Sequence, residues 1–235
     1  MFFSRVNLML YMVSVKAWES KKSLTRRQFL LFLTNLKQTE KMRFISVIPK
    51  LILQQQKMQQ QTQDRPVIVA IDGRCASGKT TLCSFIEQKT GYTVLHLDHF
   101  FLQPHQRTPQ RLAQPGGNVD YERFWQQVMV PLRQGVSFSY RPYDCSVQQL
   151  TDAVEVLPTP IVFVEGSYSC HPALWEGYDL HIFLTIRPTE QLRRIAIRNG
   201  QQGLKVFRER WIPLEERYFS AFSVQQRCEL CFATD

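Results

Sequence analysis

The stretch from residue 67 to residue 80 reads VIVAIDGRCASGKT, and it decides the fold class. Its first five residues form a continuous apolar run, which is typical of a strand covered on both faces in a parallel sheet. Residues 73–80 then satisfy the pattern G-x4-G-K-[ST], and Leu82, Phe85 and Ile86 follow at helical spacing. This order of buried strand, glycine-containing loop and helix predicts a phosphate-binding loop.

The residue types in this loop are those that hold phosphate groups. Gly73 and Gly78 allow a tight backbone turn that directs several N–H groups to one point, where the new helix adds its own unpaired N–H groups. We expect Lys79 to reach the outer phosphates of a nucleotide and the Thr80 hydroxyl to ligate Mg²⁺. The predicted nucleotide-binding residues are Gly73, Arg74, Cys75, Ala76, Ser77, Gly78, Lys79, Thr80 and Thr81.

Three more apolar runs lie further along the chain, and two of them end in acidic residues. Residues 93–97 lead to Asp98, residues 161–164 lead to Glu165, and residues 180–186 form the last run. In open α/β sheets, ligands gather at the carboxyl ends of the strands. If the strands are parallel, both acids therefore emerge at the same edge as the phosphate loop.

The two acids complete a predicted magnesium site. A nucleotide's Mg²⁺ takes hard oxygen ligands, and Thr80, Asp98 and Glu165 would supply them. Asp98 has a second expected task, which is to orient an attacking hydroxyl and accept its proton late in the transfer, because a carboxylate is a weak base toward an alcohol. The neighbouring His99 is interpreted as a packing or solvent-facing histidine.

A basic helix is predicted after residue 188, and it carries Arg193, Arg194 and Arg198. Gly200 and Gly203 then loosen the chain. Arginines beside flexible glycines suit a lid that closes over phosphates and stabilises the charge of the transition state. We therefore expect Arg194 and Arg198, together with Lys79 and Asp98, to be catalytic.

Four apolar residues follow the basic helix at spacings of four, three and four. They are Phe207, Trp211, Leu214 and Tyr218. The spacing predicts that they form the core stripe of the next helix, which Pro213 would bend.

The charge of the chain is divided unevenly. Residues 1–65 hold 12 Lys/Arg and 3 Asp/Glu, whereas residues 66–235 hold 17 of each, so the formal charge of +9 belongs to the N-terminal part. The neutral remainder argues against a nucleic-acid partner. We predict two parts: a basic, glutamine-rich extension over 1–64, mobile or outside the native fold, and the phosphate-loop domain over 65–235. The extension is open to three interpretations, namely a presequence, a contact for anions or membrane surfaces, and translated sequence upstream of Met42 or Met58.

Cysteine usage and hydropathy bear on the compartment. No run of 18 apolar residues exists, so no membrane span is expected. Six scattered cysteines in a chain of this size are typical of a reducing compartment, and we expect a cytoplasmic protein. Cys228 and Cys231 have the spacing of half a zinc site but no second pair, so they are interpreted as thiols of a terminal strand.

Six segments in this order carry a family resemblance: GRCASGKTT, HLDHFF, PGGNVDYERF, YRPYDC, VFVEG and QLRRIAIRNG. Residues 66–235 resemble the uridine kinase and phosphoribulokinase group of P-loop kinases, and within it uridine kinase-like proteins. The phosphate loop alone is common to many enzymes. An aspartate followed by aromatic residues after the second strand is shared by far fewer families, and so is the order of all six segments.

The resemblance implies a three-layer α/β fold with a largely parallel central sheet and a helical lid. It implies transfer of the γ-phosphoryl group of ATP, with Mg²⁺, to a hydroxyl of a nucleoside-like small molecule, first of all the 5′-hydroxyl of uridine or cytidine. Asp98 then is the base on the acceptor side, Asp120 holds the ribose hydroxyls, and Tyr143 meets the base. Arg194 and Arg198 correspond to lid arginines. A homo-oligomer is left open.

One departure concerns the acceptor. The uridine kinase pattern continues after its YDF segment to a histidine and an arginine that help recognise the base, whereas this chain continues from Cys145 as Ser146-Val147-Gln148-Gln149. A kinase of another small metabolite such as pantothenate is therefore one alternative. A non-catalytic nucleotide-binding switch that uses the basic tail is another.

Overall fold

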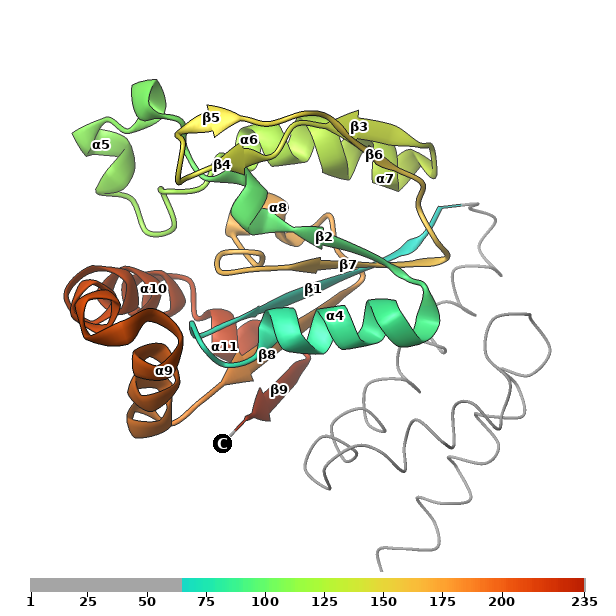
Figure 1. Cartoon of the computed structure of the whole chain (residues 1–235). Coiled ribbons are helices and arrows are strands. Elements are labelled where there is room, and N and C mark those ends of the chain that lie inside the picture. Colours follow the sequence, from blue (N-terminus) through green and yellow to red (C-terminus); the bar gives the residue numbers. More distant parts are fainter. Residues whose placement is uncertain (1–64, 235) are drawn as a thin grey trace, which may run out of the picture.

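The computed structural model describes residues 65–234, and the expectations for residues 1–64 lie outside them. Within this range a single five-stranded sheet forms the centre, in the order β2-β7-β1-β8-β9, and every neighbouring pair is parallel (Figure 1). The strands are β1 (Val67–Gly73), β2 (Thr93–His96), β7 (Ile161–Glu165), β8 (Leu180–Thr185) and β9 (Leu230–Ala233). The expected parallel α/β sheet is confirmed.

The register aligns the strand ends that matter for the site. Glu165 of β7 pairs with Ile71 of β1 on one side and with His96 of β2 on the other. Gly73, the last residue of β1, lies opposite Leu184 of β8. The phosphate loop and the acidic strand ends therefore emerge from one edge of the sheet.

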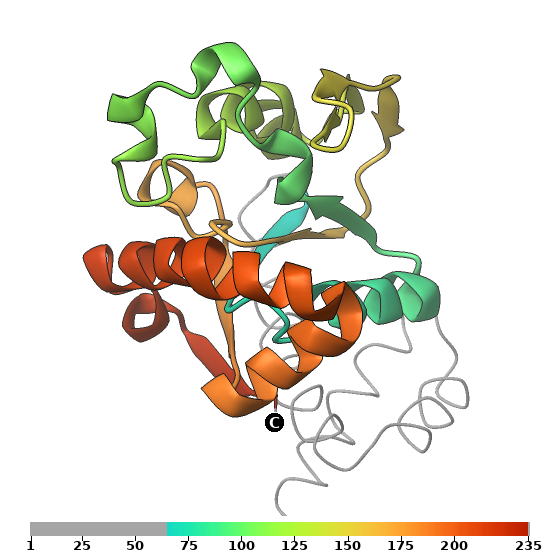
Figure 2. The ribbon, with the colours of Figure 1, turned by 60° about the vertical axis from the view of Figure 1, so that its left-hand side comes forward.

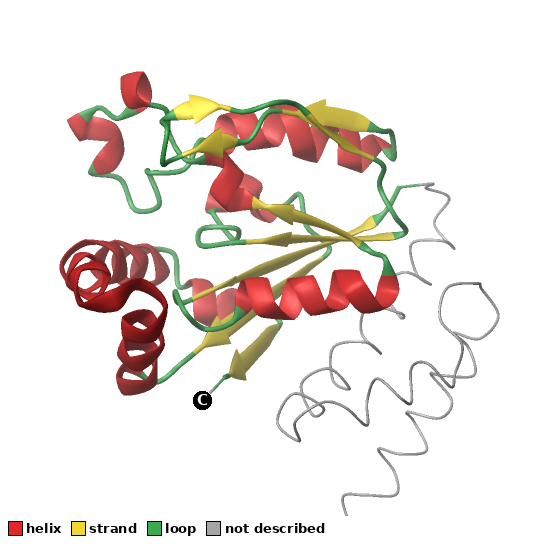
Figure 3. Ribbon diagram, viewed as in Figure 1, coloured by secondary structure: helices red, strands yellow, loops and turns green. Residues whose placement is uncertain are grey.

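Helices cover both faces of the sheet (Figure 3). Because side chains alternate along β1, Val67, Val69 and Ile71 pack in one core cluster with Cys83 and Ile86 of α4 (Lys79–Thr90). The opposite face packs against α6 (Tyr121–Phe124), α7 (Val130–Gln134), α8 (Pro172–Trp175), α10 (Ile212–Ala221) and α11 (Val224–Arg227). The fold is thus the expected three-layer arrangement.

Smaller elements form the rim above the strand ends. They are the short helices η1 (Leu97–Phe100), η2 (Pro104–Gln106) and α5 (Pro109–Leu112), and two antiparallel pairs, β3 (Phe138–Tyr140) with β6 (Val154–Val156) and β4 (Tyr143–Asp144) with β5 (Gln149–Leu150). Figure 2 shows α5 across from the C-terminal helices, with the strand ends between them.

The C-terminal helices stand in front of the strand ends (Figure 2). The first, α9 (Pro188–Val206), is interrupted at Gly200, which adopts φ 67° and ψ −178°. The chain continues through the π-helical turn η4 (Phe207–Trp211) into α10. The predicted helix after residue 188 is confirmed, and of the two glycines only Gly200 leaves the helical conformation.

Two π-helical turns share one cause. In η3 (Trp125–Met129) the N–H of Val130 donates to the carbonyl of Trp125, and in η4 the N–H of Ile212 donates to that of Phe207. Each of these donors directly precedes a proline, Pro131 or Pro213. Because proline lacks an N–H, the helix cannot continue its ordinary bonding at that position, and the last donor reaches one residue further back.

The expected core stripe after α9 is wrong in part. Tyr218 is fully buried, but Phe207, Trp211 and Leu214 are only half-buried and line a cavity. The π-turn explains the difference, because one extra residue per turn rotates the residues before it relative to those after it. Among the two C-terminal thiols, Cys231 lies in β9 as expected, whereas Cys228 ends α11 before the strand begins.

Within residues 65–234, no helix has both the length and the apolar character needed to cross a membrane.

Candidate active site

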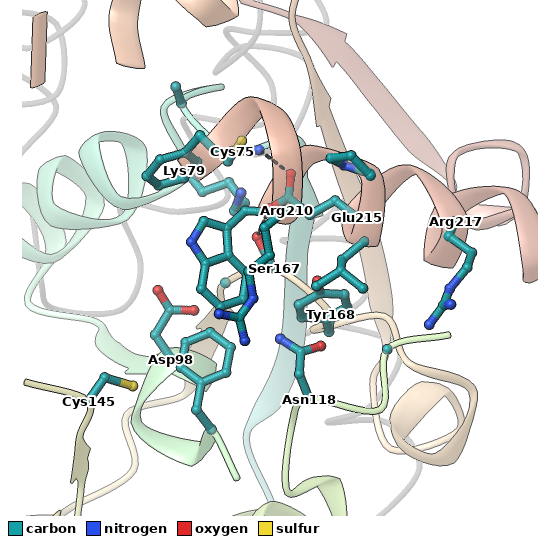
Figure 4. Close-up of a pocket in the computed structure, with 18 of the residues that line it drawn as sticks. Cys75, Lys79, Asp98, Asn118, Cys145, Ser167, Tyr168, Arg210, Glu215 and Arg217 are labelled. Carbon is teal, nitrogen blue, oxygen red and sulfur yellow. Dashed lines mark hydrogen bonds between the residues drawn. The ribbon is translucent and has the colours of Figure 1, made fainter. Parts of the chain in front are cut away.

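A cavity of about 1210 Å³ opens at the carboxyl ends of the strands (Figure 4). Its walls come from the phosphate loop and α4, from the strand ends at Asp98 and Glu165, and from the C-terminal helices. The position is the one expected for a ligand site in an open α/β sheet.

The phosphate loop is held by backbone constraints and by its own lysine. Gly73 adopts φ 137°, and a Cβ added there would lie 2.0 Å from the carbonyl oxygen of Leu184. Gly78 adopts φ 92° as the residue that caps α4. The Lys79 ammonium donates to the carbonyls of Gly73 at 2.6 Å and Arg74 at 3.1 Å. The loop thus directs N–H groups, a helix N-terminus and one cation to the same point, which fits an anionic phosphate ligand.

Glu165 and Thr80, two predicted metal ligands, lie in direct contact. The Thr80 hydroxyl is 3.1 Å and 3.3 Å from the two oxygens of the buried Glu165 carboxylate. His96 Nδ1 lies 2.7 Å from the same carboxylate, and this contact raises the pKa of His96. The histidine was not singled out from the sequence, although it directly precedes the run Leu97-Asp98.

Asp98, the third predicted ligand, shares the cavity wall with these groups (Figure 4). Its Oδ1 lies against Gly166, within 3.2 Å of the position a Cβ would take there. Burial and the neighbouring charge of Glu165 raise the pKa of Asp98 to about 6. Two carboxylates and a hydroxyl brought together in this way form a hard oxygen donor set, and that set fits Mg²⁺.

The two predicted lid arginines both line the cavity. Arg194 donates to the carbonyl of Ala76 in the phosphate loop at 3.3 Å, to that of Thr234 at 2.6 Å, and to Glu190 at 2.8 Å. The Arg198 guanidinium donates to Asn199 and lies 5.5 Å from the ring centre of Phe207. The helix α9 therefore places the Arg194 guanidinium beside the phosphate loop and that of Arg198 on the cavity wall.

Two residues expected to contact the acceptor do not line the cavity. The buried Asp120 carboxylate caps α6 by accepting the N–H of Arg123 and also accepts a bond from Gln106 at 2.7 Å. Tyr143 is buried, and its hydroxyl accepts a bond from Arg107 at 3.3 Å. Their expected roles toward an acceptor therefore remain predictions.

His99 takes the place expected for a packing histidine. Its Nδ1 lies 3.0 Å from the hydroxyl of Tyr140, and burial lowers its pKa. The two rings are 6.0 Å apart between centres.

Asp72 is a buried acid that the sequence reasoning passed over. It accepts bonds from the N–H groups of Gly73 (2.6 Å), Cys170 (2.9 Å) and Tyr168 (3.2 Å) and from the hydroxyl of Tyr218 (2.8 Å). Complete burial raises its pKa to about 6 despite these donors. An acid at the end of an otherwise apolar strand is the signal that could have revealed it.

Glu215 and Glu216 of α10 hold the phosphate loop through hydrogen bonds. Glu215 is buried and accepts the N–H of Cys75 at 2.9 Å and the hydroxyl of Ser167 at 2.6 Å. Glu216 accepts two bonds from the Arg74 guanidinium, at 2.7 Å and 3.0 Å. Figure 4 shows the bond between Glu215 and the loop. No local sequence pattern links residues 140 positions apart, so this contact could not be foreseen.

Comparisons with known proteins agree with this geometry. No protein-family model matches the chain. Uridine kinase-like protein 4 of Arabidopsis thaliana is 27% identical over 153 residues, which cover 59% of this chain and 32% of that protein. The chain thus matches about a third of the length of that relative.

Two solved structures share the fold at low sequence identity. A possible uridine kinase from Bacillus stearothermophilus superposes with a TM-score of 0.55 at 17% identity, covering 80% of this chain and 99% of that one. A putative fructose transport system kinase from Silicibacter sp. TM1040 gives a TM-score of 0.53 at 19% identity, covering 77% and 98%.

The parallel sheet, the phosphate loop and the acidic strand ends define a P-loop kinase fold. Within that class its sequence is similar to that of a uridine kinase-like protein, in agreement with the order of its motifs.

Proposed function

We propose that this protein transfers the γ-phosphoryl group of ATP to a hydroxyl of a nucleoside-like small molecule. The observation that carries the proposal is the meeting of Thr80, Glu165 and Asp98 with the phosphate loop at one cavity wall. A phosphate cradle alone would suit any nucleotide-binding protein. An acid on the cavity wall beside that cradle, free to face an acceptor hydroxyl, is what a kinase adds.

The roles of the residues follow from their positions. The N–H groups of Ala76 and of residues 78–81 would hold the phosphates, and Lys79 would turn from the carbonyls it now contacts to the outer phosphate oxygens. Thr80, Glu165 and Asp98 would hold Mg²⁺, which when bound offsets phosphate charge. Arg194 and Arg198 would add positive charge beside the transferred group.

In the proposed step the acceptor oxygen forms a bond to the γ-phosphorus while the bond from that phosphorus to the bridging oxygen of ADP breaks. The proton of the acceptor hydroxyl passes to a carboxylate oxygen of Asp98. The raised pKa of Asp98, about 6, makes it a better base than an ordinary aspartate and still leaves it ionised at neutral pH.

The first acceptors to test are uridine and cytidine at their 5′-hydroxyl, because the motifs and the relative from Arabidopsis point to uridine kinase-like proteins. Asp120 and Tyr143 would then meet the ribose and the base after a rearrangement of the rim, since neither lines the cavity. A kinase of another small metabolite such as pantothenate is the second candidate. The specific observation in its favour is Ser146-Val147-Gln148-Gln149, where uridine kinases carry base-recognising groups.

Activity measurements on two variants test the proposal. Asp98→Ala should lower kcat about 100-fold or more, as the loss of a general base does, with little change in the KM for ATP. Lys79→Ala should lower kcat/KM for ATP by a similar factor. Arg208→Ala, at an exposed position outside the cavity wall, is the matched control. ADP release that depends on an acceptor but is unchanged in both variants would refute the assignment.

The rival function, a nucleotide-binding switch, makes a different prediction. Such a protein would bind ATP without acceptor-dependent release of ADP. Nucleic-acid binding through residues 1–64 would weaken steeply with salt and disappear when those residues are removed.

A further inference from the structure

Besides Arg198, three arginines on the cavity wall have no carboxylate partner within residues 65–234. They are Arg107, Arg210 and Arg217, and none of them forms an ion pair within residues 65–234. By contrast, Arg194 on the phosphate side of the cavity is paired with Glu190. An arginine that faces a cavity without a carboxylate offers a fork of donors for an anion.

Arg107 is the best placed of the three. Its Nε donates to the carbonyl of Leu102 at 2.9 Å and its Nη2 to the hydroxyl of Tyr143 at 3.3 Å. These two bonds hold the half-buried guanidinium against the wall, while its Nη1 meets no acceptor within residues 65–234. A donor that is already oriented loses little freedom when a ligand binds.

Arg107 lies on the same side of the cavity as Asp98. Its guanidinium contacts the hydroxyl of Tyr143 in β4, and β4 packs against η1, the short helix that contains Asp98. An acceptor whose hydroxyl faces Asp98 would therefore extend toward Arg107.

Arg217 and Arg210 add charge from the C-terminal helices, and Figure 4 shows both on the cavity wall. Arg217 donates to the carbonyls of Leu112 and Gln114 and so joins α10 to the rim beside α5. The Arg210 guanidinium lies 4.6 Å from the ring centre of Trp211.

We propose that the acceptor carries an anionic group, a carboxylate or a phosphate, separate from the hydroxyl that is phosphorylated, and that Arg107 binds this group. The proposal rests on the kinase function above and narrows its acceptor. Neutral bases are recognised by matched polar groups, and this chain lacks the two that uridine kinases place after Tyr143. An unpaired guanidinium beside the Tyr143 hydroxyl supplies a charge-assisted contact instead.

Matched pairs of probes separate charge from shape. Orotidine carries a carboxylate where uridine has a hydrogen, and pantothenate carries a carboxylate where pantothenol has a hydroxymethyl group. Calorimetry on the full chain saturated with ADP and Mg²⁺ should show at least tenfold tighter binding of the anionic member of one pair. Arg107→Gln should remove that preference, Arg107→Lys should keep part of it, and the control Arg208→Gln should keep all of it.

The outcomes distinguish this subsite from the kinase function. Equal binding of both members in each pair, no binding of any probe, or a preference that survives in a folded Arg107→Gln protein would overturn the subsite. Binding of an anionic probe that depends on Arg107 supports the subsite, even if no phosphoryl group is transferred. Rapid phosphorylation of uridine at a rate that Arg107→Gln leaves unchanged supports the kinase function but not the subsite. If Arg107→Gln does not fold, Arg107→Lys should weaken the preference several-fold because lysine lacks the forked donors, and an unchanged preference there overturns the proposal.

Discussion

Replacing Tyr218 by Phe tests the buried network beneath the phosphate loop. The substitution keeps the ring in a fully buried site, so no cavity is created, and it removes only the 2.8 Å hydrogen bond to Asp72. A hydrogen bond to a charged group contributes about 1.5–3 kcal/mol. We therefore expect a loss of about 2 kcal/mol in the free energy of unfolding at pH 7.5, where Asp72 is ionised.

The loss should depend on pH. Burial raises the pKa of Asp72 from its ordinary value near 3.8 to about 6, so the folded protein holds a proton on Asp72 between these two values that the unfolded chain releases. This group therefore favours folding at low pH, and its contribution falls as pH rises through 6. Below pH 5 the hydroxyl of Tyr218 meets a neutral acid, and the cost of Tyr218→Phe should shrink to about 1 kcal/mol.

Urea unfolding at pH 7.5 and pH 4.5 measures both values, and thermal unfolding at pH 7.5 should show a fall in Tm of roughly 4–8 °C. Tyr178→Phe is the matched control, because the Tyr178 hydroxyl is buried and has no hydrogen-bond partner in the described part of the chain. It should cost nothing or stabilise slightly. Equal losses in the two variants, or a Tyr218→Phe loss that does not change with pH, would refute the reasoning.

Two further predictions concern the loop and the acidic site. Gly73→Ala should unfold the domain or lower its stability by more than about 3 kcal/mol, since the new Cβ would meet the backbone of Leu184. The control Gly91→Ala, at φ 70° in open space, should lower the stability by only about 1–2 kcal/mol in the same denaturation assay. The kcat/KM of the proposed kinase should fall as pH drops below about 6, because protonated Asp98 neither accepts a proton nor binds a cation. A higher Mg²⁺ concentration should shift this fall in kcat/KM to lower pH. A fall whose midpoint does not depend on the Mg²⁺ concentration would argue against a carboxylate near the ion.

The fold could be predicted because its signals are local. A continuous apolar run followed by residues 73–80 specifies strand, loop and helix within two dozen residues, and the structure places β1 and α4 there. The acids Asp98 and Glu165 were also found, since each directly follows or ends an apolar run and the strands of the central sheet are parallel. In these segments, pattern and tertiary position agree.

The rest of the site depends on contacts between distant segments. Glu215 reaches Cys75 across 140 positions, and Arg107 reaches Tyr143 through the folding of the rim. The spacing of Phe207 and Trp211 was interpreted with an α-helical period, and the π-turn there made that interpretation fail. Only the folded structure shows that the helix at this position contains a π-turn and is not a regular α-helix.

That bulge has a consequence for the orientation of the helical segment between Gly200 and Phe207. A π-turn acts as a one-residue insertion in a helix, and each inserted residue changes the rotational phase of everything before it by about 100°. After the turn, Glu215 and Glu216 anchor α10 to the phosphate loop. The helix α10 therefore stays fixed, and the segment before the turn rotates relative to it. Deleting one residue from 207–211 would therefore swing Phe207 and the preceding segment around the helix axis while leaving the anchored end in place. The direction in which the side chains between Gly200 and the π-turn face is therefore set by the number of residues that precede Pro213.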